Sequence, residues 1–473
     1  MYSLLFLGFA SFVLSLFLTP LVRNLALRFG LVDLPDDQRK HHKVPVPRVG
    51  GIAILAATVG AYALLLLVGH NAGHIVRHGI PFAVRLLPAV LVIFGVGLAD
   101  DIFDLSAWNK LGAEIAAAML AWAGGIRLGN MGGHYFSGAL SFGLTILWVV
   151  ACSNAVNLID GVDGLAAGVG LFATITTLIA GLLHGNMDLV FATAPLAGAL
   201  LGFLRFNFNP ASIFLGDCGS LTLGFLLGCY GIVWSEKSPT LLGMTAPLLA
   251  LSVPLLDAGI SIARRFLRKQ PIFQGDRSHI HHKLLSRGLT PRRVVLLLYG
   301  FCGLAAAASL MITTTHQQYQ GFVIVLVCLA AWLGLQHLGY NEFAIAGKLA
   351  MDGSFRRLLN AQFVLIGFEE ELANAPTLEQ CWEILCNACP QFGFIGSELQ
   401  LDGAECFGDP TGGWYVRIDF PGHGYIHLKR QPGSADRGTA AVLFIDSISR
   451  ILTQRFTQVT SNESEALVYE NAD

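Results

Sequence analysis

Apolar runs, each close to the length that crosses a bilayer, follow one another through the first 340 residues of this chain. A transmembrane helix needs about 20 consecutive apolar residues. We place about eleven spans near residues 3–22, 49–69, 84–99, 111–125, 139–155, 164–183, 189–205, 219–235, 241–263, 294–312 and 321–338. Only 13% of the 473 residues are charged, whereas a soluble domain carries about 25%. The sequence therefore predicts an all-α polytopic membrane protein.

The distribution of Lys and Arg predicts how the spans are oriented. The segments 23–48, 100–110, 205–217 and 264–293 together contain seventeen basic residues, and the loops on the other side contain four. Because basic residues accumulate on the cytoplasmic side, we expect the first set in the cytoplasm, the N-terminus outside and the C-terminus inside. The first span has no basic start and no small-residue cleavage site, so it is expected to be an uncleaved anchor.

Five aspartates border the apolar runs. Asp100 and Asp101 follow VLVIFGVGLA, Asp160 and Asp163 close NAVNLIDGVDGL, and Asp217 lies in IFLGDCGSL. All five fall on the predicted cytoplasmic side. Carboxylates at the edge of a bilayer are costly, and by default they indicate a functional site. Their oxygens suit a divalent cation and the phosphates that it holds, so the pattern predicts phosphoryl chemistry at a membrane surface.

Other polar residues extend these motifs. Asn154, Asn157, Asp160 and Asp163 recur every three residues, a spacing that predicts a polar stripe on a helix. Lys110 precedes the next span and could reach a diphosphate as a point charge, or could be a lysine of a solvated loop. Asp217 taken alone could simply cap a helix.

Two loops are rich in cations and histidines. The loop RRFLRKQPIFQGDRSHIHHKLLSRG follows the ninth span, and DLPDDQRKHHKVPVPRVGG precedes the second. Histidines could be metal ligands, but the surrounding cations favour phosphate binding, and the preference for positive charge inside explains many of the cations. We expect the first of these loops to bind anions or lipid headgroups.

The composition changes after about residue 340. Residues 352–473 contain seventeen acidic and eight basic residues and no further span, and 341–351 is the expected linker. Amphipathic helices surround three alternating segments, 392–401, 413–420 and 424–430, which predicts a small cytoplasmic α+β domain. It resembles a GAF-like sensor module, although a docking or stabilising appendage fits equally well. The lone CxxC of Cys386 and Cys389 has no second cysteine pair to complete a zinc site.

The ordered set DD…K, NAVNLIDGVDGL, FLGDCGSL and DRSHIHH, on about eleven spans, resembles the polyprenyl-phosphate N-acetylhexosamine-1-phosphate transferases over residues 1–340. The resemblance implies a bacterial inner (cytoplasmic) membrane enzyme that moves a sugar-1-phosphate from a UDP-N-acetylhexosamine to undecaprenyl phosphate and releases UMP, with Mg²⁺ or Mn²⁺. The HIHH form is similar to the branch that initiates O-antigen, common-antigen and teichoic-acid linkage units. GlcNAc-1-phosphate is the expected group, in the first membrane step of cell-surface polysaccharide synthesis.

The same resemblance implies roles for individual residues. Asp217 and Asn157 would be the metal ligands. Asp100 and Asp101 would line the catalytic centre, and Asp160 and Asp163 match the acidic motif of the family. The substrate-binding residues would be Lys110, Asn154, Arg277, His279, His281, His282, Lys40 and Arg48.

Some alternatives stay open at the level of sequence. Asp100 or Asp101 could position the lipid phosphate for direct attack, or one of them could be a covalent nucleophile. A cation-coupled transporter would place its acids near mid-bilayer within repeated halves, and a membrane-anchored sensor would have its function in the C-terminal domain. We expect no nucleic-acid partner. The sequence leaves open a homodimer and a further partner or ligand of the C-terminal domain.

Overall fold

The structure is a computed structural model that divides into two compact units, residues 1–340 and 341–473. In the first unit it describes residues 2–33, 45–68, 72–131, 134–236, 245–267, 279–314, 325 and 329. In the second it describes residues 365, 367–372, 374–375, 378–392, 394–401, 414–420, 424–430, 441 and 444–450.

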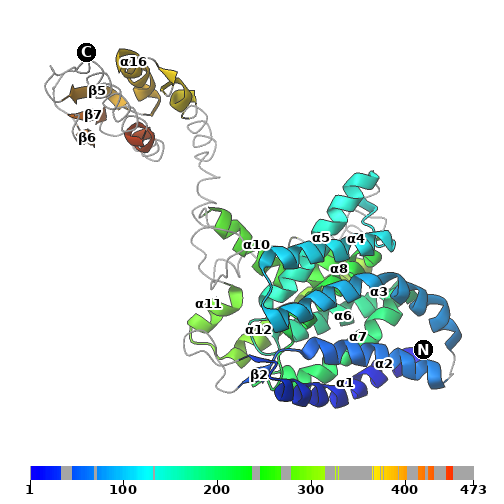
Figure 1. Cartoon of the computed structure of the whole chain (residues 1–473). Coiled ribbons are helices and arrows are strands. Elements are labelled where there is room, and N and C mark those ends of the chain that lie inside the picture. The colour runs from blue at the N-terminus through cyan, green and yellow to red at the C-terminus, as the bar shows by residue number, and fades with distance from the viewer. Residues whose placement is uncertain are drawn as a thin grey trace, which may run out of the picture. The chain divides into compact units, whose positions relative to one another are not determined.

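The first unit is a bundle of helices (Figure 1). Its helices are α1 (Tyr2–Phe29), α2 (Gly50–Val68), α3 (Ala72–Phe103), α4 (Ala107–Ala123), α5 (Gly138–Ile159), α6 (Leu165–Leu183), α7 (Met187–Asn207), α8 (Gly216–Glu236), α9 (Thr245–Ala250), α10 (Ser252–Leu267), α11 (Ile280–Ser286) and α12 (Pro291–Thr314). Two short antiparallel ladders join β1 (Val32–Asp33) to β2 (Val46–Pro47) and β3 (Asn130–Met131) to β4 (His134–Tyr135).

Eight helices of the described residues are long and apolar enough to cross a membrane, namely α1, α2, α3, α5, α6, α7, α8 and α12. They coincide with eight of the predicted spans, which confirms a polytopic helical protein. Of the other three, the span near 111–125 is the 17-residue helix α4, and the span near 241–263 is divided between α9 and α10. The span near 321–338 lies almost wholly outside the described residues, so a count of eleven stays a prediction.

Helix α8 is the centre of the bundle. It contacts α2, α3, α5 and α6. In its most apolar 18-residue segment 89% of the residues are buried, compared with 28% in α1. Glycines bring its neighbours unusually close to its N-terminal end. A Cβ on Gly97 would lie 2.6 Å from the Asp217 carbonyl oxygen, and one on Gly51 would lie 2.4 Å from the Gly219 nitrogen. Because only glycine leaves this space, the first turn of α8 is held directly against α2 and α3.

Only the first two of the four polar residues predicted to form one stripe, Asn154 and Asn157, lie on a helix. Helix α5 ends at Ile159, Asp160 is its C-cap, and Asp163 lies in the turn that follows. The prediction of one helix through all four positions was therefore wrong. Gly164 is the N-cap of the next helix, α6, and its φ of 78° is in the left-handed region that favours glycine. The Tyr299 hydroxyl on α12 donates a hydrogen bond to the Gly164 carbonyl and ties this turn to the bundle.

The second unit contains helix α16 (Leu378–Ala388), a 3₁₀ turn (Cys389–Phe392) and strands β5 (Phe394–Leu401), β6 (Trp414–Phe420) and β7 (Gly424–Arg430). The strands form an antiparallel sheet in the order β5-β7-β6, on the three segments whose alternation predicts strands. A separate core forms around Phe444, whose ring stacks on Phe392 at 4.3 Å between centroids. This unit therefore has its own hydrophobic core, as an independent domain requires.

Candidate active site

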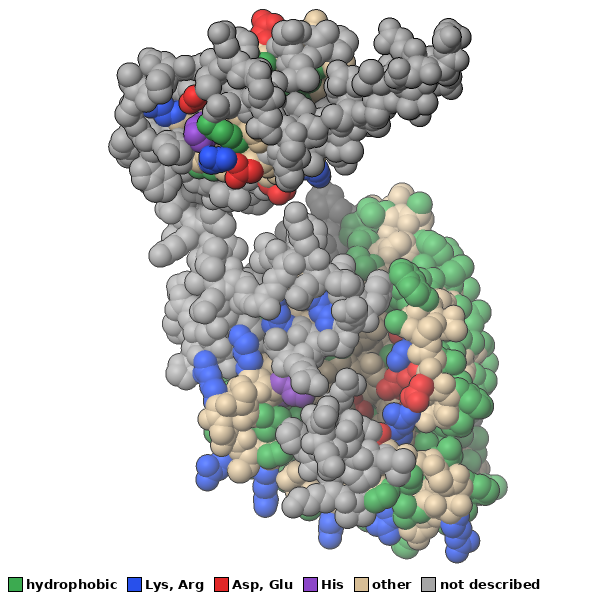
Figure 2. Space-filling view, turned by 60° about the vertical axis from the view of Figure 1, so that its left-hand side comes forward, with side chains coloured by type: hydrophobic (Ala, Val, Ile, Leu, Met, Phe, Trp, Pro, Cys, Tyr) green, Lys and Arg blue, Asp and Glu red, His purple; other side chains and the backbone are tan. Residues whose placement is uncertain are grey.

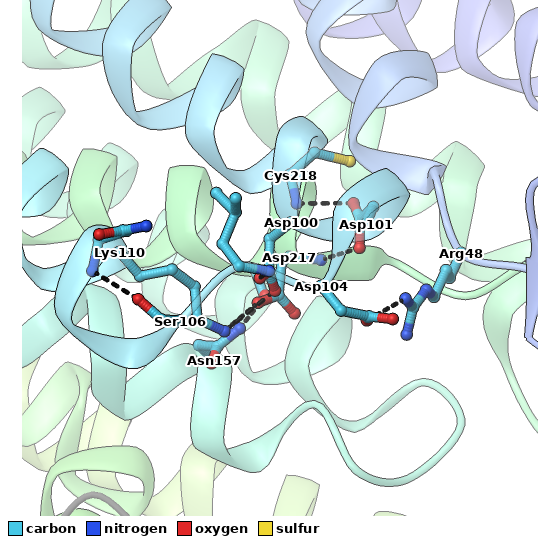
Figure 3. Close-up of polar contacts among 12 residues, drawn as sticks. Arg48, Asp100, Asp101, Asp104, Ser106, Lys110, Asn157, Asp217 and Cys218 are labelled. Carbon is cyan, nitrogen blue, oxygen red and sulfur yellow. Dashed lines mark hydrogen bonds and ion pairs between the residues drawn. The ribbon is translucent and has the colours of Figure 1, made fainter.

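The first turn of α8 is capped by a carboxylate from another helix. The backbone N–H groups of Asp217 and Cys218 donate to the two oxygens of Asp101 on α3, at 2.8 and 3.0 Å (Figure 3). Asp101 is only 7% exposed. Backbone N–H groups at a helix N-terminus have no partner within the helix, so a buried carboxylate is a strong cap there. Asp217 itself does not act as the cap, and its own carboxylate is left for other contacts.

A lysine joins the next two carboxylates. Lys110 Nζ on α4 lies 3.0 Å from Asp100 Oδ2 and 3.2 Å from Asp217 Oδ2, so α3, α4 and α8 meet at one ammonium group (Figure 3). The other oxygen of Asp100 accepts the Leu105 N–H at 2.7 Å, which fixes the loop between α3 and α4. Asp217, more than a hundred residues further along the chain, is thus brought together with Asp100 and Lys110 as the motifs predict.

Arg48 lies beside this cluster in an ion pair that sequence reasoning did not identify. Its Nη2 donates to Asp104 Oδ1 at 2.8 Å (Figure 3). Its Nη1 lies 3.8 Å from Asp33 Oδ1. Asp104 has a φ of 48°, a backbone conformation rarely adopted outside glycine, asparagine and aspartate. The spacing of Asp104 behind Asp100 and Asp101 was the available signal. Arg48 therefore connects the β1–β2 region to the loop that carries Asp104, directly after α3.

Two asparagines of α5 face the same cluster from a third side. Asn157 donates its amide to Ser220 Oγ on α8 at 2.9 Å, which leaves its amide oxygen for a ligand. Asn154 donates to a carboxylate oxygen of Glu114 on α4. Glu114 is 2% exposed and lies one turn after Lys110. It was missed because an acid inside an apolar run carries no motif of its own.

The acidic pair after α5 divides into two roles. Asp163 Oδ2 accepts from the Asn209 side chain at 2.9 Å and from the Ala211 N–H at 3.0 Å, so it holds the loop before α8. Asp160 makes no such side-chain hydrogen bond within the described residues. Burial, together with the carboxylates of Asp217, Asp101 and Asp163, raises the pKa of Asp160 well above its usual range. Asp160 is therefore a carboxylate that a cation or a proton would stabilise.

The histidine motif is anchored by an acid of α10. His279 Nδ1 lies 3.1 Å from Asp257 Oδ2, and the Ile280 N–H donates to Asp257 Oδ1 at 2.8 Å. The ring centroids of His281 and His282 are 4.3 Å apart. Burial and the two neighbouring imidazoles lower the pKa of His281 to about 4, although Asp257 opposes the shift. Asp257 was also missed, since its segment is predicted as a plain span.

Lys40 and Arg277, the remaining predicted site residues, lie outside the described residues. The other predicted site residues all belong to the first unit. In Figure 2, acidic side chains gather with Lys and Arg side chains beside a broad hydrophobic surface of that unit. Phosphoryl chemistry at a membrane surface requires this combination of charge and apolar surroundings.

The residues present fit a hard divalent cation. Asp217 and Asn157 offer a carboxylate and an amide oxygen, the donor types that Mg²⁺ prefers. Among the described residues, no group of three or more His, Cys, Asp or Glu side chains is arranged to hold a metal by itself. Mg²⁺ commonly uses one or two carboxylates and completes its shell with water and substrate phosphates. A site in which the protein supplies two ligands, next to the Lys110 ammonium group, therefore suits this ion.

Comparisons with known proteins show the family to which the chain belongs. Residues 83–235, which contain α4, α5 and the first turn of α8, match the glycosyl transferase family 4. The chain is 34% identical over 297 residues to a probable undecaprenyl-phosphate N-acetylglucosaminyl 1-phosphate transferase of Bacillus subtilis (strain 168), covering 61% of this chain and 79% of that protein.

Two further relatives agree. A decaprenyl-phosphate N-acetylglucosaminephosphotransferase of Mycobacterium tuberculosis (strain CDC 1551 / Oshkosh) is 36% identical over 64% of this chain and 81% of its own length. An undecaprenyl-phosphate alpha-N-acetylglucosaminyl 1-phosphate transferase of Escherichia coli (strain K12) is 29% identical over 66% of this chain and 84% of its own length. The comparisons do not support a transporter or a sensor. The chain belongs to glycosyl transferase family 4, among the polyprenyl-phosphate N-acetylglucosamine-1-phosphate transferases.

Proposed function

We propose that this protein transfers N-acetylglucosamine-1-phosphate from UDP-N-acetylglucosamine to undecaprenyl phosphate, forming undecaprenyl-diphosphate-N-acetylglucosamine and UMP. The relatives named for this reaction support the proposal. The observation that carries it is the position of Lys110 between Asp100 and Asp217. These carboxylates take two of the three ammonium N–H groups, and among the described residues no further hydrogen bond occupies the third, which can donate to a phosphate oxygen.

The reaction exchanges one phosphoanhydride bond for another. An oxygen of the lipid phosphate attacks the β-phosphorus of the UDP-sugar, the bond from that phosphorus to the bridging oxygen breaks, and the electron pair leaves with UMP. A phosphate monoester has a second pKa of about 6, so the lipid phosphate is mostly a dianion at neutral pH. It is then nucleophilic without a strong general base.

The described residues support this chemistry through position and charge. Lys110 neutralises part of the charge on the diphosphate, and Arg48 can exchange the carboxylate of Asp104 for a phosphate. Asp101 holds the α8 turn that carries Asp217, so it acts on the reaction through Asp217. Asp100 orients Lys110 from the other side. A bound Mg²⁺ or Mn²⁺, held by Asp217 and Asn157, would neutralise negative charge that develops on the leaving UMP.

We further propose that the site faces the cytoplasm of a bacterial inner membrane. The seventeen basic residues of the four segments on the site's side, compared with four on the other, support this orientation. UDP-sugars and UMP are soluble anions, so a site on that face would take the donor from the cytoplasm and the acceptor from the bilayer.

Direct attack and a two-step route predict different results with the donor alone. Enzyme mixed with UDP-N-acetylglucosamine and metal, but no lipid, should release no stoichiometric burst of UMP and should retain no labelled phosphosugar. Mass spectrometry of a peptide containing Asp100 and Asp101 checks for an acyl-phosphate adduct. Such an adduct, formed at the rate of turnover, would establish the two-step route instead.

The proposed substrates can be tested with purified full-length protein in nanodiscs that contain undecaprenyl phosphate. A panel of radiolabelled UDP-sugars is offered with and without Mg²⁺, and lipid-linked product is separated by chromatography. UDP-N-acetylglucosamine should give the highest rate, and EDTA should abolish it. A labelled lipid from a different UDP-sugar only, or an unchanged rate in EDTA, would contradict the sugar or the metal assignment respectively.

A further inference from the structure

We propose that Asp257 is a positioning residue that sets the tautomer and orientation of His279, so that His279 presents a defined Nε2 edge to the diphosphate of the donor. The proposal rests on the function proposed above, and no motif of the sequence points to Asp257. Asp257 lies on α10 and is 2% exposed. A carboxylate buried this deeply must be compensated by hydrogen bonds or opposite charge. Its described partners belong to the histidine motif.

The hydrogen bonds determine which nitrogen of His279 carries hydrogen. An ionised carboxylate only accepts hydrogen bonds. Asp257 Oδ1 accepts the Ile280 N–H at 2.8 Å, and Oδ2 lies 3.1 Å from His279 Nδ1. His279 Nδ1 must therefore be the protonated nitrogen. A histidine oriented in this way has its other nitrogen fixed in direction and in chemical character.

The same carboxylate also places His281. Its Nδ1 lies 4.0 Å from Asp257 Oδ2, and the rings of His279 and His281 are stacked with 4° between their planes. On its far side, His281 Nε2 approaches the backbone at Gly161, where a Cβ would lie only 3.0 Å away. Asp257 therefore fixes the histidine motif against the turn that carries Asp160, and this contact places the motif next to the acidic cluster.

Replacing Asp257 with asparagine tests the tautomer with little change of shape. The side chain can still accept the Ile280 N–H through its oxygen, and its NH₂ group then faces His279 Nδ1. The ring should respond by moving its hydrogen to Nε2. In serine proteases the corresponding change leaves the geometry intact and greatly lowers kcat because the histidine has the wrong tautomer. Here we expect kcat to fall roughly 10- to 100-fold, the range known for partners that orient histidine ligands.

The direct measurement is ¹⁵N NMR of the full-length protein, labelled at histidine and reconstituted in nanodiscs, with His279→Gln used to assign the signal. Wild-type His279 should show a protonated Nδ1, and Asp257→Asn should show the Nε2–H tautomer. Asp188→Asn, which removes an aspartate at the start of α7, is the matched control and should change neither tautomer nor rate. This readout needs no turnover, so it can fail or succeed independently of the proposed function.

A double-mutant comparison then shows whether Asp257 acts through His279. The Asp257→Asn/His279→Gln variant should be only slightly slower than His279→Gln alone, because asparagine can still accept the Ile280 N–H and the remaining contact, with His281, is 4.0 Å long. A wild-type signal for the Nε2–H tautomer would overturn the proposal, and so would additive losses in the double variant. If Asp257→Asn does not fold, the wild-type spectrum still decides the first point.

Discussion

Replacing Gly97 by alanine should disturb the site by pushing α3 away from α8. A Cβ at position 97 would lie 2.6 Å from both the Asp217 carbonyl oxygen and Cys218 Cα, whereas ordinary contact begins at 3.4 Å. The two helices would have to separate by roughly 0.8 Å to remove this overlap. Both hydrogen bonds from the α8 turn to Asp101, now 2.8 and 3.0 Å, would then be stretched beyond good geometry.

The expected losses follow from this displacement. Overpacking of this kind costs about 1–3 kcal/mol in the free energy of unfolding, and alanine in a helix returns at most about 1 kcal/mol. A net destabilisation of about 1–2 kcal/mol should result. A shift near 1 Å in a catalytic group can lower the rate about 100-fold, so the loss of transfer activity should exceed the loss of stability.

Gly95→Ala is the matched control on the same helix. A Cβ at position 95 meets nothing within 4 Å, so this variant should keep full activity and at least wild-type stability. Thermal unfolding in nanodiscs and the initial rate of lipid-linked product formation, measured side by side, compare the two variants. If Gly97→Ala matched Gly95→Ala in both measurements, close packing of α3 on α8 would not be what positions Asp217.

Three further outcomes are expected. Asp217→Asn should lower the transfer rate roughly 10²–10³-fold, as the loss of a charge-stabilising group does, and should leave folding unchanged. Asp188→Asn is the control. Near-normal turnover of Asp217→Asn in Mg²⁺ would show that Asp217 is not a metal ligand. Truncation shortly after Lys348 should leave an enzyme that still inserts into the membrane. Its affinity for the donor, measured by isothermal titration, should stay within a few-fold of that of the full-length protein. A well-folded truncation that binds neither donor nor metal would show that the second unit completes the site. His281→Gln should flatten the pH dependence of stability between pH 6.5 and 4. Burial and the neighbouring imidazoles lower the folded pKa of His281 to about 4, so the unfolded chain binds more protons in this window and wild-type stability falls as the pH falls through it. An equal loss of stability between pH 7.5 and pH 5 in the two proteins would contradict this.

The sequence predicts the membrane helices and the convergence of the acids, because both depend on local patterns. Apolar runs of about 20 residues predict membrane-spanning helices. Carboxylates at their edges indicate a functional site by default, because an acidic group there is costly. Asp100, Lys110 and Asp217 meet in space as these rules lead one to expect.

The roles within the cluster could not be predicted, because each depends on a partner distant in the chain. Asp101 caps a helix that begins more than a hundred residues later, and Glu114 meets Asn154 across two helices. Asp257 looks like any residue of an apolar run until α10 is placed against the histidine motif. The turn between α5 and α6, in which the left-handed Gly164 caps α6, cannot be seen in a three-residue repeat of polar residues.

The transfer of the phosphate together with the sugar is tested most directly by following the β-phosphate of the donor. UDP-N-acetylglucosamine labelled with ³²P at that position is given to the full-length enzyme in nanodiscs with undecaprenyl phosphate and Mg²⁺, and both products are quantified. Sugar-1-phosphate transfer predicts that the label enters the lipid fraction and that one unlabelled UMP appears per lipid product. Label recovered as UDP beside a lipid monophosphate sugar would mean that the bond from sugar to phosphate is broken instead, and would contradict the proposed reaction.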